Sequence, residues 1–462
     1  MKKAVLFSVF SSILIFFLFN ATAAGDQRVS TKGWKAGVAR AVITPVEPIW
    51  MAGYGSRDHP SEGTLVDLWA KVLAIEDAKG KKVVLVTTDI LGFPKKMSDR
   101  IRDQLAIKYG LSRSQIILSS SHTHTGPVLM DALFDIYPLD AKQKEVIRKY
   151  STSLEKQIVA LAGDAIRSMV PAQLFSQNGV TRFQVNRRNN SEATLSNQSD
   201  LNGPNDFSVP VLKVADLSGN LMAVAFGYAC HATVLSIYQF SGDYPGFAQI
   251  ELEKLHPGVT AMFFQGAGAD QNPLPRRTVP LAQQYGRELA AAVDRVLNED
   301  IKKLEPSIST AYSEVNLTFS TPPTKEALMK MVKETNGYQQ RWATNQLATL
   351  RMNGSLLNSY PYPVQIWKLG EQTIMALGGE LVVQYAIELK KLFGPEIFVM
   401  GYANDEMAYI PSETVLKEGG YEGESSQMVY GMPSKWNSDI QVKILNEFEK
   451  LAVKAGVKQV PQ

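Results

Sequence analysis

Short apolar runs alternate along this chain with longer segments whose apolar residues recur at helical spacing. The strand-like runs cover residues 83–88, 115–118, 221–228 and 373–377. The helical segments cover residues 97–109, 143–168, 281–297 and 381–392. A buried strand needs only a short apolar run, whereas a helix shows a period near 3.6 residues, so the alternation predicts an α/β fold. We expect mixed β-sheets flanked by helices in one large domain, with the polar stretch 189–205 as a surface loop.

The first residues indicate export. Lys2 and Lys3 precede an apolar run over residues 4–19, and the small residues Ala21-Thr22-Ala23 follow it. A positive start, an apolar core and small residues at a cleavage point are typical of a signal peptide. The alternative is a transmembrane anchor, but the run is shorter than the roughly 20 residues that a spanning helix needs. The sequence predicts a signal peptide over residues 1–23, a mature domain over residues 24–462, and a secreted or periplasmic protein without a transmembrane segment after cleavage.

Charge and cysteine content exclude several classes of protein. The chain has 48 Lys and Arg against 45 Asp and Glu, a net charge of +3. Such a balance offers no electrostatic basis for binding nucleic acid. Cys230 is the only cysteine of the chain, which excludes an intrachain disulfide. A chain of 462 residues can bury a sufficient core without one, so this does not contradict export. The oligomeric state stays open.

Two histidines follow the strand-like run 115–118, in the segment 119–127 (SSSHTHTGP). Residues two apart in an extended chain face the same side, so His122 and His124 can converge on one point. Neutral imidazole is a common zinc ligand. The alternative is a polar turn that ends at Gly126 and Pro127. The chain has only 5 histidines, and this spacing at a strand end favours a metal site.

His231 and Glu380 are further candidate ligands. His231 follows the run 221–228, although a single histidine in such a place is more often a hydrogen-bonded core residue. The neighbouring Cys230 would face the other way in a strand. Glu380 follows Gly378-Gly379 and precedes the helical pattern that starts at residue 381, so we expect it in the first helical turn. There it either complements the helix dipole or binds a metal.

Other polar residues have weaker signals. Asp270 lies in the segment 265–273 (QGAGADQNP), which lacks the third glycine of a dinucleotide-binding loop and predicts a tight turn after a strand. Arg187 and Arg188 are expected to be solvated surface charges, or else one of them orients a polar or anionic part of a substrate. Tyr421 lies in the loop 419–423 (GGYEG), whose glycines allow a ligand to approach closely.

Together and in this order, these motifs resemble the neutral/alkaline non-lysosomal ceramidase family. The segments 37–45 (GVARAVITP) and 51–55 (MAGYG) are similar to the start of that family. The segment 122–127 (HTHTGP) resembles its His-Thr-His-Ser-Gly-Pro signature and is the most specific match. The resemblance runs from Trp34 to about Tyr430.

The resemblance implies one Zn2+ held by His122, His231, Glu380 and Tyr421. It makes His124 a group that assists proton transfer, with Asp270 as the other candidate proton acceptor. Asn272 stands where the family carries a serine implicated in catalysis, so a serine-centred mechanism is not expected here. Asn272 can instead donate a hydrogen bond to a developing oxyanion. We also expect the chain to lack the immunoglobulin-like C-terminal domain of typical ceramidases.

The implied activity is hydrolysis of an amide (N-acyl) bond in a small-molecule or lipid-like substrate by a metal-activated water. One alternative is an esterase or a carbohydrate deacylase that uses the same zinc site. Another is a catalytically inactive binding protein on this fold.

Overall fold

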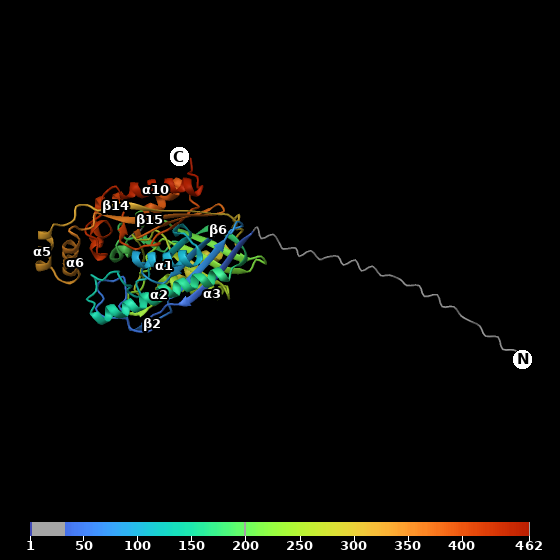
Figure 1. Cartoon of the computed structure of the whole chain (residues 1–462), viewed down its shortest axis with the longest axis horizontal. Helices are drawn as coiled ribbons and strands as arrows, with labels where there is room; N and C mark the ends of the chain where they lie inside the picture. The colour runs from blue at the N-terminus through green and yellow to red at the C-terminus, as the bar shows by residue number, and fades with distance from the viewer. Residues whose placement is uncertain (2–32, 198–199, 462) are drawn as a thin grey trace. The chain divides into compact units, whose positions relative to one another are not determined.

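The computed structural model describes Met1 and residues 33–197 and 200–461. Within these residues, most strands belong to two sheets (Figure 1). The larger sheet has the strand order β11-β9-β8-β6-β1-β3-β4-β5, and β13 pairs with β6. Its strands are β1 (Trp34–Val42), β3 (Trp69–Glu76), β4 (Lys82–Thr88), β5 (Ile116–Ser120), β6 (Val170–Val180), β8 (Ser208–Asp216), β9 (Leu221–Tyr228), β11 (Thr260–Gln265) and β13 (Lys302–Lys303). Neighbours are antiparallel except for the β4–β5 and β9–β11 pairs, which makes this a mixed sheet.

The second sheet comes from the C-terminal half and has the order β14-β15-β16-β18. Its strands are β14 (Ile308–Thr318), β15 (Ser359–Leu369), β16 (Gln372–Leu377) and β18 (Phe398–Met400). Short strands pair outside the two sheets: β2 (Gly63–Thr64) with β10 (Gln239–Phe240), β7 (Gln184–Asn186) with β12 (Gln271–Pro273), and β17 (Glu380–Leu381) with β19 (Tyr409–Ile410). The last two pairs contain two of the site residues predicted from the sequence, Asn272 in β12 and Glu380 in β17.

Helices cover the outer face of each sheet. The α-helices are α1 (Lys95–Tyr109), α2 (Ala141–Arg167), α3 (Asp243–Leu255), α4 (Val279–Leu297), α5 (Lys325–Glu334), α6 (Gly337–Asn353), α7 (Gln384–Phe393), α8 (Glu413–Glu418), α9 (Ser426–Val429) and α10 (Ile440–Ala455). Two 3-10 helices, η1 (Arg113–Gln115) and η2 (Glu192–Asn197), and one short π-helix, η3 (Tyr421–Ser425), complete the described helical segments. Helices α1 to α4 pack on the larger sheet, and α7 and α10 pack on the second; Figure 1 labels α2 and α3 on one side of the molecule and α10 on the other. The order of layers is therefore helix, sheet, sheet, helix.

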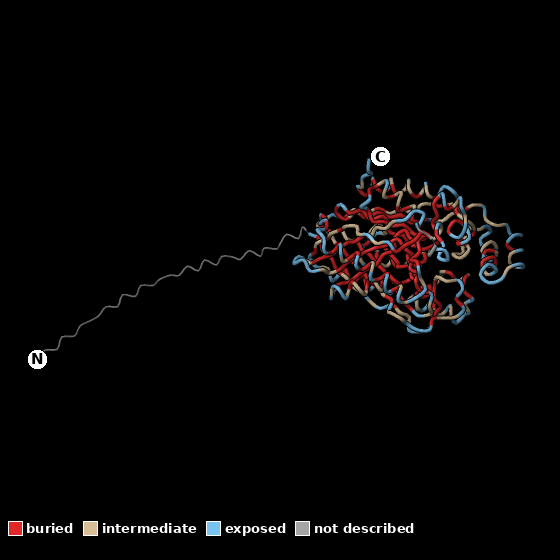
Figure 2. The backbone as a smooth tube through the Cα atoms, turned by 180° about the vertical axis from the view of Figure 1, so that it is seen from behind, coloured by how far each residue is buried: buried red, intermediate tan, exposed pale blue. Residues whose placement is uncertain are grey.

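The two sheets face each other across a shared apolar core. Leu85 and Met262 of the larger sheet pack in the same buried cluster as Trp367 and Phe398 of the second. Figure 2 shows that the buried backbone is concentrated in this central part. Burial of each large apolar side chain contributes roughly 1.5–3 kcal/mol, so the layer between the sheets is a main source of stability.

Local signals explain where the helices begin and end. Asp140 precedes α2, and its carboxylate accepts a hydrogen bond from the Gln143 amide at 2.7 Å. Gly110 ends α1 with a left-handed φ of 67°, a conformation that glycine adopts without steric cost. Among the described residues, no helix combines the length and apolar character that crossing a bilayer requires.

The expected fold class is confirmed: mixed sheets are flanked by helices. All four predicted strands and all four predicted helices are present, with ends shifted by a few residues. The described residues from Gly33 onward belong to one compact unit. The predicted signal peptide lies outside the described residues, so the boundary at residue 24 stays a prediction.

Candidate metal centre

Three histidines reach one point from two strand ends of the larger sheet. His122 and His124 follow β5, and His231 follows β9. Each of these two strands has one parallel neighbour: β4 beside β5, and β11 beside β9. Ends of parallel strands are common places for ligand sites, because the loops that leave them converge. The sequence placed these histidines correctly at strand ends.

The reason why His122 and His124 converge differs from the expected one. Strand β5 ends at Ser120, and His122 has a left-handed φ of 56° instead of an extended backbone. A residue other than glycine is uncommon in that region and is held there by its surroundings. The turn at His122, not the alternation of an extended strand, directs both imidazoles to the same side.

Glu380 also differs from the expectation, because it lies in β17 and not in a first helical turn. Helix α7 begins only at Gln384. The Glu380 amide donates to the Ala408 carbonyl at 2.9 Å, and the preceding Gly379 amide donates to Asp405 at 2.8 Å. Because β17 pairs in this way with β19 and the residues before it, its backbone is extended and a helix cannot start here. Gly379, at a φ of 69°, makes the turn that leads into this short strand.

The four side chains bring their polar atoms together in a buried place. His124 Nε2 lies 3.1 Å from His122 Nε2. Glu380 Oε2 lies 3.1 Å from His231 Nε2 and 3.4 Å from His122 Nε2. All four residues are at most 9% exposed. Three imidazoles and one carboxylate thus surround a common point.

The hydrogen bonds on the far side of the rings show that this group fits a cation. His122 Nδ1 lies 2.9 Å from the Leu91 carbonyl, and His231 Nδ1 lies 2.9 Å from the Gly268 carbonyl. A carbonyl only accepts, so each Nδ1 carries a proton, and Nε2 is the nitrogen of each ring that can bind a cation after losing any proton of its own. Lone pairs and a carboxylate that face one another repel unless a cation lies between them. Nitrogen and carboxylate donors of this kind suit zinc.

Burial and charge shift the pKa values of the group in opposite directions. Burial alone would lower the pKa of His122, but Glu406 and Glu380 outweigh it and raise that pKa to about 10. Burial lowers the pKa of His231 to about 4 and that of His124 well below its usual value. The imidazolium of His122 then holds the pKa of Glu380 low, despite the burial of that carboxyl group. Without a metal, one proton therefore supplies the positive charge that the cluster needs.

Sequence reasoning missed two residues of this site, Glu406 and Tyr430. Glu406 Oε1 lies 2.9 Å from His122 Nδ1 and so accepts from the same N–H as Leu91. The Tyr430 hydroxyl donates to Glu380 Oε1 and lies 3.4 Å from Glu406 Oε1. Glu406 comes a few residues after β18, so its place after a buried strand was an available signal.

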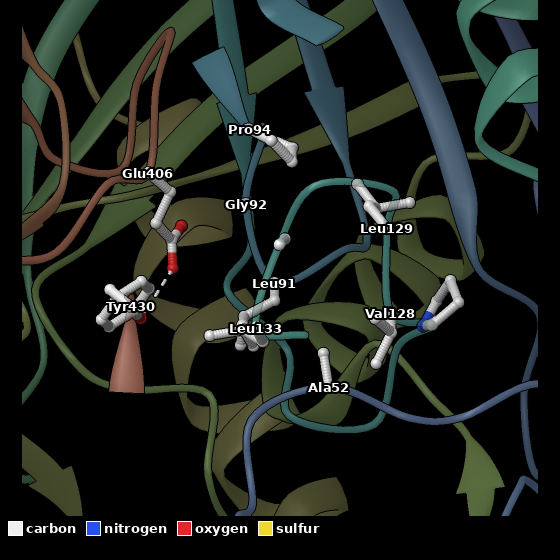
Figure 3. Close-up of a pocket in the computed structure, with 11 residues that line it drawn as sticks. Ala52, Leu91, Gly92, Pro94, Val128, Leu129, Leu133, Glu406 and Tyr430 are labelled. Atoms are coloured by element: carbon white, nitrogen blue, oxygen red, sulfur yellow. Dashed lines mark hydrogen bonds between the residues drawn. The ribbon is translucent and has the colours of Figure 1, made fainter. Parts of the chain in front are cut away.

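Glu406 and Tyr430 also line a small pocket whose other walls are mainly apolar. Figure 3 shows Leu91, Leu129 and Leu133 around it, with the two polar side chains at one side. Its volume is about 20 Å3, which is room for about one water molecule.

Tyr421, the fourth predicted ligand, lies at the rim of the cluster. Its side chain is 46% exposed. Its ring centroid is 5.3 Å from that of Tyr409, and the Tyr409 ring stacks 6.4 Å from that of His231. Within the described residues, no hydrogen bond joins Tyr421 to the histidines or to Glu380. The structure thus brings Tyr421 near the other three predicted ligands but not into direct contact with them.

Asp270 and Asn272 lie on the other side of the site. The Asp270 carboxylate accepts from the Val383 amide at 2.9 Å and from Asn186 Nδ2 at 3.2 Å, so both of its oxygens hold neighbouring loops. Burial raises the pKa of Asp270. Asn272 accepts from Arg187 Nη1 at 3.5 Å through its Oδ1. Its Nδ2 donates to no described residue.

The expectation that Arg187 and Arg188 are solvated surface charges is wrong. Their side chains are only 20% and 14% exposed, and both donate to Glu422 at 2.7 Å. Arg187 also donates to the Tyr409 hydroxyl at 3.1 Å. A charged side chain is stable in such a place only when it is paired. These arginines therefore form part of the wall beside the cluster.

A buried cluster of imidazole and carboxylate groups at the strand ends of a layered α/β fold defines a candidate metal-dependent protein. Comparison with known proteins identifies the family. Residues 34–268 match the family described as "Neutral/alkaline non-lysosomal ceramidase, N-terminal". The chain belongs to this neutral/alkaline non-lysosomal ceramidase family.

Individual relatives agree with this assignment. The chain is 27% identical over 257 residues to the neutral ceramidase of Drosophila pseudoobscura pseudoobscura, covering 52% of this chain and 35% of that protein. It is 25% identical over 287 residues to the neutral ceramidase of Pseudomonas aeruginosa, covering 58% of this chain and 41% of that protein. The matches thus span less than half the length of these relatives.

A solved structure matches over more of the chain. The crystal structure of the neutral ceramidase from Pseudomonas aeruginosa superposes with a TM-score of 0.71 at 19% identity. The superposition covers 93% of this chain and 76% of that one. At this identity the likeness shows a shared fold.

Proposed function

We propose that this protein is an exported zinc-dependent hydrolase that cleaves an N-acyl amide bond. The observation that carries the proposal is the convergence of His122, His124, His231 and Glu380, with the Nε2 atoms of the three imidazoles turned toward one another. Membership of the ceramidase family supports amide hydrolysis as the reaction. Bound zinc would lower the pKa of a water molecule to about 7 and polarise the scissile carbonyl.

His122, His231 and Glu380 would hold the metal, and Tyr421 would complete the set from the rim. The carbonyls of Leu91 and Gly268 fix the imidazole tautomers that this role requires. Tyr430 keeps one oxygen of Glu380 occupied, so that the other oxygen points to the cluster. These contacts orient the ligands before any metal binds.

His124 is a better candidate than Asp270 for moving the proton. Arg57 donates to the His124 carbonyl at 3.0 Å, and the Tyr54 ring packs edge-on against the imidazole at 4.8 Å. His124 Nδ1 has no hydrogen-bond partner among the described residues. Both oxygens of Asp270 are already occupied by loop contacts.

Asn272 would stabilise the oxyanion of the tetrahedral intermediate. Arg187 holds its Oδ1, which directs the donor Nδ2 to the opposite side. Removing one such donor typically costs on the order of 100-fold in turnover. We therefore expect Asn272→Ala to lower turnover strongly while zinc content stays at the level of the unchanged protein, and unchanged turnover would remove Asn272 from the mechanism.

The decisive experiment is elemental analysis of the purified protein, the His122→Ala variant and a His59→Ala control. His59 is an exposed histidine paired with Asp58 and Glu62, so its loss changes the histidine count without touching the cluster. We expect about one zinc per chain in the unchanged protein and the control, and little in His122→Ala. Equal zinc in all three would refute the site.

Turnover then separates the possible reactions. Ceramides, N-acyl amino sugars and simple esters are assayed with and without chelator. Amide cleavage that chelator abolishes supports the proposal, whereas ester cleavage alone favours the esterase. Full zinc occupancy without turnover of any of these substrates favours a binding protein. N-terminal sequencing of the exported chain tests cleavage after residue 23.

A further inference from the structure

A broad polar cavity adjoins the candidate metal centre. Its volume is about 810 Å3, and Arg187, Asn272 and Tyr421 belong both to its lining and to the rim of the centre. The remaining walls come from the segment 188–194, together with Leu274, Arg276 and Glu422. We call this cavity the polar basin. A group bonded to an amide at the metal centre would extend into it.

The charges of the polar basin are already balanced. Arg188 donates to Glu418 at 2.8 Å, and Glu422 accepts from both Arg187 and Arg188 at 2.7 Å. On the opposite wall, Arg276 donates to Glu192 at 2.9 Å. Three guanidinium groups are thus matched by three carboxylates. This pairing leaves no excess of positive charge that would select an anionic ligand.

Hydrogen-bonding groups that remain available face the same space. Asn272 Nδ2 and the Tyr421 hydroxyl, which the proposed function assigns to the oxyanion and to the metal, form the edge of the basin nearest the centre. Asn189 and Thr194 are exposed in the wall made by the segment 188–194, and the Thr194 hydroxyl, which donates to the Ser191 carbonyl at 3.3 Å, can still accept a hydrogen bond. Amides and hydroxyls of this kind both donate and accept, so they match a ligand whose groups also do both. Alcohol groups have that property.

Apolar surface is scarce around the polar basin. Leu274 is the one aliphatic side chain among the described residues of its lining. On the Glu406 and Tyr430 side of the centre, the apolar pocket in Figure 3 provides only about 20 Å3. A long alkyl chain needs an apolar wall to leave water, and these two cavities do not provide one.

We propose that the polar basin binds the head group of the substrate and that this head group is neutral and rich in hydroxyls. The chemical class is an N-acyl amino sugar and not a lipid with two long chains. This inference rests on the proposed amide hydrolysis at the metal centre. The half-exposed Tyr421 ring offers a flat surface for a sugar ring, and Asn189 offers hydrogen bonds to its hydroxyls.

Binding and turnover are measured separately on the full-length, zinc-loaded protein. Ligand-observed NMR titrations compare N-acetylglucosamine with a short-chain ceramide and with an acidic N-acetylated sugar. The variant Asn189→Leu removes a polar group from the basin wall. Asn446→Leu is the matched control, because Asn446 is exposed on α10 and does not line the basin. Thermal unfolding confirms that both variants fold.

We expect the neutral amino sugar to bind most tightly, and Asn189→Leu to weaken this binding about fivefold to tenfold, the effect of one lost hydrogen bond. Zinc content should not change, and Asn446→Leu should bind as the unchanged protein does. Binding of the ceramide but not of the sugar overturns the inference, as does preferential binding of the acidic sugar. If the ceramide is also cleaved, the proposed function survives that failure. Sugar binding without cleavage of any N-acyl substrate supports the polar basin and refutes the proposed function.

Discussion

Replacing Glu406 tests how the protein prepares His122 for a metal. Glu406 Oε1 accepts from His122 Nδ1 at 2.9 Å, and the Glu406 amide donates to Phe93 at 2.8 Å, so the backbone fixes its position. Glu406→Leu keeps a similar volume and removes the acceptor. Glu406→Gln keeps an oxygen that can accept the same N–H.

The expected magnitude follows from the number of acceptors at His122 Nδ1. Loss of a partner behind a metal ligand typically weakens metal affinity 10- to 100-fold. The Leu91 carbonyl, also at 2.9 Å, still fixes the tautomer, so we expect the lower end for Glu406→Leu. A weakening of about tenfold corresponds to about 1.4 kcal/mol. For Glu406→Gln we expect about twofold to threefold, because the amide oxygen replaces the carboxylate oxygen.

Competition for zinc against a chromophoric chelator at constant pH measures the affinity. Thermal unfolding of the metal-free proteins controls for changes in stability. Zinc affinity of Glu406→Leu equal to that of the unchanged protein would refute the idea that Glu406 supports His122. If Glu406→Gln loses as much affinity as Glu406→Leu, the negative charge matters and not the hydrogen bond.

Three further changes test other parts of the structure. Gly53→Ala should destabilise the protein by about 1–3 kcal/mol and lower turnover, because a Cβ there would lie 2.4 Å from the His124 ring and the φ of 102° strains any other residue. The control Gly63→Ala has open space around it and should change neither stability nor turnover. Urea unfolding and an activity assay compare the two variants. Asp405→Asn tests the pH dependence of stability. Burial raises the pKa of Asp405 to about 7, so the folded state binds the carboxyl proton more tightly than the unfolded chain does. Folding stability is therefore lost as pH rises from about 4, near the pKa in the unfolded chain, through 7. The variant should therefore gain stability relative to the original protein between pH 5 and pH 8 in chelator, and a constant difference would contradict the raised pKa. Phe226→Ala, at a position that is 0% exposed, should cost about 3–5 kcal/mol in urea unfolding, and a cost below 1 kcal/mol would show that the core around β9 is loosely packed.

The sequence predicted the strands and helices well because hydrophobic periodicity reports burial directly. The run 221–228 coincides with β9, since every residue of its second half faces a covered side of the sheet. The start of α7 was misplaced because the helical pattern after Glu380 does not reveal that the backbone pairs with β19, far along the chain. Such long-range pairing overrides local propensity.

The candidate site was predictable only in part. The histidines were visible because they follow strong strand signals, and Glu380 because it follows Gly378-Gly379. Tyr421 gained a ligand role only through the family resemblance. Glu406 was missed because an acidic residue after a weak three-residue strand resembles a surface loop. The arginines were misjudged because their partner Glu422 lies more than 230 residues away, and pairing over that separation leaves no local trace.

The site also joins segments that are remote along the chain. All three histidines precede residue 268, where the family match ends, whereas Glu380 comes from the C-terminal half. Asn404 already connects the two sheets, since its amide group bonds to the Leu118 backbone and to Gln365. An ion shared by His122 and Glu380 would act as a reversible cross-link between the halves. A chain cut once in the exposed turn at residues 354–358 should then dissociate more slowly with the ion bound than in its absence.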